Sequence, residues 1–244
     1  MERATQGTAW RGADDIGERQ PALFLDSLPR PVREALLSIG SPQRYAPGEK
    51  ILAEGARGDY LVLLESGRVK VTGKLGSGQD ALIAIRVGGD MVGEMAVIDG
   101  VPRSATVTAC EDVEAHVIQG QAMRRFLDQY PEVALEIARL IIRRLRKANS
   151  WRIAFASSSV RVRLAWTLAE LAQEHGRADR SYIVICLHLT QTELGAFVGA
   201  GHSAAHKALV RFRDEKIIRT SDHWMTVMKL NRLREIAGMS TIHL

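Results

Sequence analysis

Between Tyr45 and Gln119 the chain alternates short β-forming runs with glycine-containing turns. Many short strands at closely spaced turn signals are typical of a β-sandwich or a β-barrel. We therefore expect this part of the chain to form one small β-domain. The expected strands include residues 60–64, 69–72, 81–85 and 106–109, and the turn glycines include Gly48, Gly55, Gly67, Gly78 and Gly89.

Residues 93–106 connect two of these runs and carry the polar chemistry of the expected domain. They read GEMAVIDGVPRSAT, which places Glu94, Arg103 and Ser104 close together after Gly93. Backbone amides and Arg103 can face an anion, while Glu94 can accept a hydrogen bond from a hydroxyl. The segment therefore suits a small ligand that has both groups. The simpler alternative is a hairpin with an exposed ion pair between Glu94 and Arg103.

The charge of the chain is divided unevenly. Residues 1–138 hold 15 Lys+Arg against 20 Asp+Glu, whereas residues 139–244 hold 18 against 8. A strongly basic half is the electrostatic feature expected of a nucleic-acid-binding domain. A solvated basic surface without a partner is the alternative. With 244 residues the chain can form one large domain or two small ones.

Other classes of protein find little support in the sequence. No run of about 18 apolar residues could span a membrane, and residues 1–20 lack the apolar segment of a secretory signal, so we expect a cytoplasmic chain with a disordered N-terminal tail. Cys110 and Cys186 stand singly in apolar runs and fit a reduced core. No catalytic or metal-ligating constellation stands out. The spacing of His202 and His206 is better explained by an exposed helix.

A long helix is expected over residues 131–156. Its apolar residues form one stripe, which can pack against a second copy of the chain or into the core of the same chain. Ser159 can cap a further helix that ends near Gly176, so residues 157–159 form a candidate hinge. The stripe consists of Val133, Ile137, Leu140, Ile141 and Leu145.

Residues 189–212 have the pattern of two short helices joined by a glycine turn. Thr190 and Glu193 form a capping box for the first helix, and residues 199–201 supply the turn. In a helix-turn-helix unit the second helix enters the major groove of DNA. Residues 217–228 fit a following hairpin, or wing. A generic helical hairpin is the alternative.

Taken together, these segments resemble the catabolite activator (CRP/FNR) superfamily from about Phe24 to Arg234. The resemblance implies an α+β chain: a jelly-roll cyclic-nucleotide-binding domain, a long dimerisation helix and a winged helix-turn-helix domain. It further implies a bacterial transcription regulator that binds double-stranded DNA as a homodimer and contacts RNA polymerase. The expected divisions are a tail (1–20), the β-domain (21–130), the dimerisation helix (131–156), a hinge (157–159), the DNA-binding domain (160–236) and a second tail (237–244).

The resemblance also assigns residues to a cyclic-nucleotide site, with cyclic AMP as the expected ligand. Glu94 corresponds to the contact with the ribose 2′-hydroxyl, and Arg103 and Ser104 to the contacts with the cyclic phosphate. On the long helix the family carries a Thr followed by Ser or Asn, but this chain has Ala148 and Asn149, so one hydroxyl that would reach the base is absent. The full expected set is Gly93, Glu94, Met95, Ala96, Arg103, Ser104, Ala105 and Asn149, and no metal is implied.

The expected DNA-binding residues depart from the familiar pattern of Arg, Glu and Arg on the recognition helix. His and Ser cannot copy the bidentate contact of Arg with guanine, whereas Lys207 keeps a guanine contact, which implies a different or looser operator. The expected base and phosphate contacts are Thr190, Gln191, His202, Ser203, His206, Lys207, Arg211 and His223.

Two other function classes stay open at this point. One is a regulator of the same family that acts without a ligand or responds to another small molecule, which the change at Ala148 favours. The other is a cyclic-nucleotide module that regulates an enzyme or a channel, but the sequence shows neither a catalytic domain nor membrane spans. An enzyme is not expected.

Overall fold

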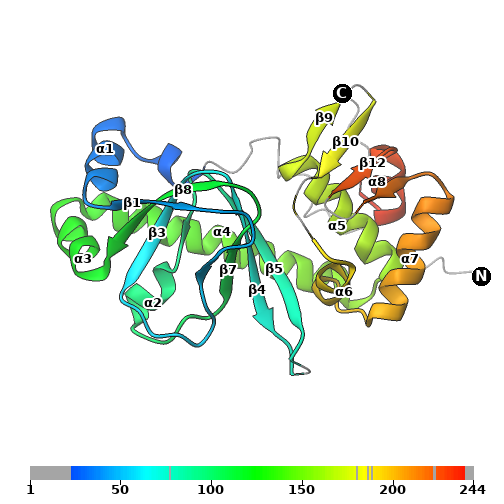
Figure 1. Ribbon diagram of the computed structural model, residues 1–244, viewed down its shortest axis with the longest axis horizontal. Helices are drawn as coiled ribbons and strands as arrows, with labels where there is room; N and C mark the ends of the chain where they lie inside the picture. The colour runs from blue at the N-terminus through cyan, green and yellow to red at the C-terminus, as the bar shows by residue number, and fades with distance from the viewer. Residues whose placement is uncertain are drawn as a thin grey trace, which may run out of the picture.

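A computed structural model describes residues 23–76, 78–179, 181–185, 187, 189–221 and 224–239. It has a β-rich N-terminal body and a mixed C-terminal body, and one long helix joins them (Figure 1). The expected α+β architecture is therefore confirmed. The expected tail at 1–20 lies outside the described residues, as do residues 240–244 of the second tail. Within the described ranges, no helix has the length and apolar character needed to cross a bilayer.

The N-terminal body is a sandwich of two antiparallel four-stranded sheets, with strand orders β1-β8-β3-β6 and β2-β7-β4-β5. Strand β3 explains the continuous apolar run seen in the sequence. Leu61 and Leu63 pack under helices α1 (Arg30–Ser38) and α3 (Gly120–Gln129), whereas Val62 and Leu64 point into the sandwich. Because successive side chains of a strand point to opposite faces, a strand covered on both faces reads as apolar throughout. The strands are β1 (Ser41–Tyr45), β2 (Lys50–Leu52), β3 (Tyr60–Ser66), β4 (Arg68–Lys74), β5 (Asp80–Val87), β6 (Met91–Val92), β7 (Thr106–Ala109) and β8 (Val113–Gln119).

Helix α4 is the long helix, and it changes the interpretation of the apolar stripe. Val133, Ile137 and Leu140 are buried in the core of their own N-terminal body, together with Met123 and Phe126. The idea that the whole stripe faces a second copy is wrong, because the sandwich leaves this side open and α4 covers it. The helices of this half are η1 (Leu25–Ser27), α1 (Arg30–Ser38), α2 (Glu94–Asp99), α3 (Gly120–Gln129) and α4 (Pro131–Ala156).

A second apolar row lies on the opposite face of α4 and is exposed. Its members are three or four residues apart, as in a coiled-coil seam, and one of them is polar. Leu145 of the predicted stripe belongs to this row and is 58% exposed. We call this row the α4 seam; it consists of Leu135, Ala138, Ile142, Leu145, Asn149 and Ile153.

The C-terminal body contains the predicted helix-turn-helix and wing. Ser159 caps α5, since its hydroxyl accepts from the Val162 amide at 3.4 Å, and the capping box of Thr190 and Glu193 is present. The wing strands belong to a four-stranded sheet of order β11-β12-β10-β9, whose β9–β10 hairpin the sequence analysis missed. The elements are α5 (Val160–His175), β9 (Arg177–Asp179), β10 (Tyr182–Ile185), α6 (Gln191–Phe197), α7 (His202–Asp214), β11 (Ile218–Thr220), β12 (Met225–Val227) and α8 (Leu230–Ala237).

The two bodies are in direct contact through strand β5 and helix α6, which lie side by side in Figure 1. Leu82 and Ile85 of β5 belong to the hydrophobic core of the C-terminal body. Beside them, Lys70 Nζ donates to Glu193 Oε1 at 2.6 Å. The other oxygen of Glu193 accepts from the Thr190 amide at 2.8 Å, so one carboxylate both caps α6 and binds the N-terminal body.

Candidate functional site

The segment 93–106 forms a short helix, α2, followed by a turn, and not an open loop between strands. Glu94 is the first residue of α2, and it is buried with only 3% of its surface exposed. Arg103 lies in the turn after α2 and is 5% exposed. The alternative of an exposed ion pair between Glu94 and Arg103 is therefore wrong: both side chains are buried, and each has other partners.

Arg103 supports the segment from beneath. Its Nη1 donates to the Gly93 carbonyl at 2.8 Å and its Nη2 donates to the Tyr60 carbonyl at 2.6 Å. The guanidinium also lies over the Tyr60 ring, 4.6 Å from its centroid. In this conformation both terminal nitrogens of Arg103 bind backbone carbonyls, so the side chain fixes the shape of the segment and places a positive charge below it.

Gly93 occupies a position that no other residue fits. Its φ is +82°, and a Cβ there would lie 2.7 Å from Arg103 Nη1 and 3.0 Å from Leu52 Cδ1. The left-handed conformation and the close approach both require glycine.

Gly93→Ala is expected to lower the free energy of unfolding by about 1–3 kcal/mol, because it adds a clash to the backbone strain. Gly100→Ala is the matched control. Gly100 has a φ of +73° but nothing within 4 Å of an added Cβ, so only the strain applies. Urea unfolding of both variants measures the difference, and equal losses would show that the packing of Arg103 against Gly93 carries no energy.

Arg144 of α4 is the partner of Glu94, although the sequence did not predict this residue as part of the site. Its Nη1 donates to Glu94 Oε1 at 2.7 Å, and its Nη2 donates to the Met91 carbonyl at 2.8 Å. The side chains of Arg144 and Glu94 are 21% and 4% exposed. A signal was present, since Arg144 precedes Ala148 by one helical turn and so lies on the same face of α4.

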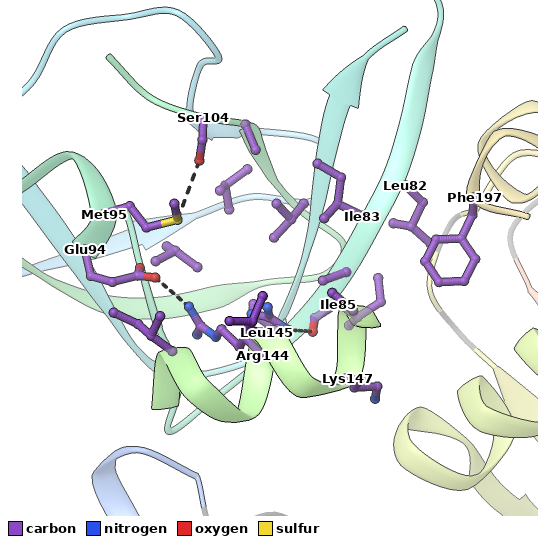
Figure 2. A pocket seen from close by; sticks show the side chains of 18 of the residues that line it. Leu82, Ile83, Ile85, Glu94, Met95, Ser104, Arg144, Leu145, Lys147 and Phe197 are labelled. Carbon is purple, nitrogen blue, oxygen red and sulfur yellow. Dashed lines mark hydrogen bonds and ion pairs between the residues drawn. The ribbon is translucent and has the colours of Figure 1, made fainter. Parts of the chain in front are cut away.

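A cavity of about 520 Å³ opens above this pair and extends from α2 to the C-terminal body. Figure 2 shows Glu94, Met95 and Ser104 on one side of it, Arg144 and Leu145 on another, and Phe197 beyond Leu82. All the expected ligand residues line it except Asn149, which lies exposed on the α4 seam. Its further lining residues include Ala148, Trp151, Thr167, Glu170, Glu174 and His175.

The far wall of the cavity is charged and only partly buried. Lys147 of α4 forms ion pairs with Glu174 and, at 3.8 Å, with Glu170 of α5. Desolvation raises the pKa of Glu170, with the nearby Glu174 as the next cause. Burial also lowers the pKa of His175 to about 4, against the opposing effect of Glu174. These groups connect the long helix to the first helix of the C-terminal body.

His175 predicts how stability depends on pH. In the unfolded chain His175 takes up a proton near pH 6.5, whereas the folded chain resists it until about pH 4. The contribution of His175 to the free energy of unfolding is therefore fully present above pH 6.5. Up to about 3 kcal/mol of it is lost as the pH drops toward 4. Urea unfolding at several pH values should show this slope, and His175→Gln should flatten it. The exposed His206→Gln serves as the control, and an unchanged slope in His175→Gln would contradict the prediction.

Helix α7 presents the expected DNA-binding residues on one exposed face. Ala205, Ala208, Leu209 and Phe212 are buried, whereas the expected contact residues of α7 are His202, Ser203, His206, Lys207 and Arg211, and all are exposed. Thr190 is also exposed. Gln191 is partly buried, and its side-chain oxygen accepts from His206 Nδ1 at 2.9 Å. His223 lies outside the described residues. The arrangement leaves a polar helix face of the kind that enters a major groove.

The described residues hold no group of three or more His, Cys, Asp or Glu arranged to bind a metal ion. The rings of His202 and His206 stack with centroids 6.1 Å apart. Cys110 is buried, and burial raises the pKa of its thiol to about 11, which fits a core thiol. Cys186 lies outside the described part of the chain.

Comparison with known proteins divides the chain as the fold does. Residues 42–130 match the cyclic nucleotide-binding domain family, and residues 162–236 match the Crp-like helix-turn-helix domain family. A CRP-like cAMP-activated global transcriptional regulator of Mycobacterium tuberculosis is 30% identical over 82% of this chain and 89% of its own length. This chain belongs to the CRP/FNR superfamily. It is a CRP-like transcription regulator with a cyclic-nucleotide-binding domain and a DNA-binding helix-turn-helix domain.

Other members of the CRP/FNR superfamily are also similar to this regulator. The cyclic AMP receptor protein of Thermus thermophilus is 27% identical over 82% of this chain and 90% of its own length. Among solved structures, the c-di-GMP responsive global regulator CLP of Xanthomonas campestris has a TM-score of 0.71 at 18% identity, covering 81% of this chain and 98% of that one. The second likeness shows the fold alone.

Proposed function

We propose that this regulator is a homodimer controlled by cyclic AMP, which binds in the cavity between α2 and α4. The observation that carries the proposal is the buried pair of Glu94 and Arg144 at the floor of that cavity. A carboxylate held there can accept hydrogen bonds from a ribose hydroxyl. The cavity volume of about 520 Å³ lies within the range of small-molecule sites, about 300–1,000 Å³.

The cyclic phosphate would lie over the turn after α2, where Ser104 offers a hydroxyl and Arg103 supplies positive charge from below. Met95, Ala96 and Ala105 complete that wall. Asn149 would act on the ligand bound in the other copy, because it lies on the α4 seam and not on the cavity of its own chain. The similarity to cAMP-activated regulators supports the choice of ligand.

The ligand would control DNA binding by favouring one arrangement of the two bodies. A ligand shifts such an equilibrium only as far as its affinities for the two arrangements differ. Here the cavity has walls from both bodies, so a bound nucleotide would contact each of them. The regulator would act in the cytoplasm of a bacterium, on double-stranded DNA and with RNA polymerase, and would catalyse no reaction.

The proposal is tested by selecting duplexes from a random DNA pool and measuring their affinity with and without cyclic AMP. We expect cyclic AMP to raise the affinity of the selected duplex. Lys207→Ala should weaken specific binding by about 1–3 kcal/mol, and Arg211→Ala should weaken binding to all sequences and reduce its salt dependence. Equal DNA affinity with and without cyclic AMP would contradict control by this ligand.

A second candidate is a regulator of the same family with a different effector. The methyl group of Ala148, at the position where the family carries a hydroxyl, favours it, and a structural relative is described as c-di-GMP responsive. Calorimetric titration with cyclic GMP and cyclic di-GMP beside cyclic AMP separates the two candidates, because the true effector should bind the tightest and alone raise DNA affinity.

A further inference from the structure

The cavity continues past Ala148 into the C-terminal body. There it is lined by Trp151 of α4, Thr167 of α5 and Phe197 of α6. The Trp151 ring packs edge-on against Phe197, with centroids 4.5 Å apart. An apolar, aromatic wall of this kind suits the flat ring system of a nucleotide base.

Three of the residues that line this part of the cavity have a buried polar side-chain atom without a hydrogen-bond partner among the described residues. The atoms are Thr167 Oγ1, Trp151 Nε1 and His175 Nδ1. Thr167 is only 1% exposed, and a buried hydroxyl that is left unpaired is destabilising. These atoms therefore point to a ligand that supplies missing partners.

The charged side chains nearby already have partners. Lys147 pairs with Glu170 and Glu174, and Arg86 donates to the Ile85 carbonyl at 3.1 Å. The groups left to read an uncharged ligand edge are the Thr167 hydroxyl and the Trp151 indole, together with His175 Nδ1. A hydroxyl can accept from an amino group, and an indole N–H can donate to a ring nitrogen. An adenine base offers both.

We infer that Thr167 and Trp151 read the adenine base of the bound nucleotide and take the place of the hydroxyl that Ala148 lacks. This inference rests on the proposed function and adds a specificity site to it. Because Thr167 belongs to α5, the C-terminal body contributes directly to ligand binding. The hydrogen bond between the ligand and Thr167 then holds α5 against the long helix. The same contact would therefore recognise the base and couple the ligand to the DNA-binding body.

The inference is tested with two ligands and two variants. Thr167→Val keeps the shape of the side chain and removes the hydroxyl, and Thr167→Ser keeps the hydroxyl. The ligands are cyclic AMP and the cyclic monophosphate of purine riboside, which lacks the 6-amino group. Calorimetry gives each dissociation constant, and urea unfolding without ligand checks that Thr167→Val is folded.

We expect Thr167→Val to weaken cyclic AMP binding about tenfold, which corresponds to one hydrogen bond of about 1.4 kcal/mol, and to leave the purine analogue unaffected. Thr167→Ser should restore cyclic AMP binding. Trp151→Phe should weaken both ligands, because both keep the ring nitrogens. The gain in DNA affinity caused by cyclic AMP should shrink in Thr167→Val.

Other outcomes overturn the inference. If Thr167→Val weakens both ligands equally, or neither of them, the hydroxyl does not meet the amino group, although cyclic AMP control stands. If the wild-type chain binds no cyclic nucleotide, the proposed function fails together with the inference. The binding of the wild-type chain thus distinguishes one failure from the other.

Discussion

Arg144→Met is expected to destabilise the protein by about 3 kcal/mol and to weaken cyclic AMP binding 10- to 100-fold. The substitution leaves the buried carboxylate of Glu94 without its partner at 2.7 Å, and breaking a buried ion pair in this way costs about 3–5 kcal/mol. Glu94 is then no longer held for the ribose hydroxyl, and a hydrogen bond to a charged group is worth about 1.5–3 kcal/mol. Urea unfolding and calorimetric titration measure the two losses.

Two controls separate the ion pair from general damage. In Glu94→Gln combined with Arg144→Met, the charge of Glu94 is removed together with its partner and the longer pair of Arg144 with Asp90, at 3.4 Å, stays broken, so much of the stability should return while binding stays weak. Arg30→Met breaks the pair of Arg30 with Glu34, whose side chains are 81% and 62% exposed, and it should change stability by less than about 1 kcal/mol. If Arg144→Met has no larger effect than Arg30→Met, the buried pair does not organise the site.

The parts of the structure that follow from local chemistry were predictable from sequence. The strands between glycine turns, the capping box at Thr190 and the cap at Ser159 depend on residues within a few positions of each other. Helix α2 was missed because its apolar residues continue the pattern of the flanking strands, and only the backbone at Gly93 starts a helix there. The β9–β10 hairpin was missed although its pairing is local, because β9 has only three residues and all are exposed, so that no alternating apolar pattern marks it.

In the site, too, contacts between residues close in sequence were predictable, and contacts between distant residues were not. Glu94, Arg103 and Ser104 are close in sequence, and all three line the cavity or hold its wall. The partner of Glu94 was not predictable from that segment, because Arg144 is fifty residues away on another element. The role of Val133, Ile137 and Leu140 was also undetermined, since an apolar stripe on a helix does not reveal whether its own domain or a second copy covers it.

The α4 seam yields the other large expected effect. Leu135→Asp combined with Ile142→Asp should convert the proposed dimer to a monomer and remove specific DNA binding. Leu135 and Ile142 are 53% and 48% exposed in the single chain and do not line the cavity, so the charges disturb neither its own core nor the ligand site. In a dimer joined along this seam, each carboxylate would lie unpaired in an apolar contact, which opposes association strongly. Sedimentation equilibrium measures the mass, and a shift assay measures DNA binding.

The matched control places the same two charges off the seam. Ser150 and Ala154 are also exposed on α4, but they lie outside the row of three- and four-residue spacing, so Ser150→Asp with Ala154→Asp should stay dimeric. Asn149 sharpens the test, because a polar residue within a seam fixes register at a cost in stability. The Asn149→Leu variant should therefore dimerise more tightly. If the two aspartates on the α4 seam leave the mass of the dimer unchanged, the interface lies elsewhere on the molecule.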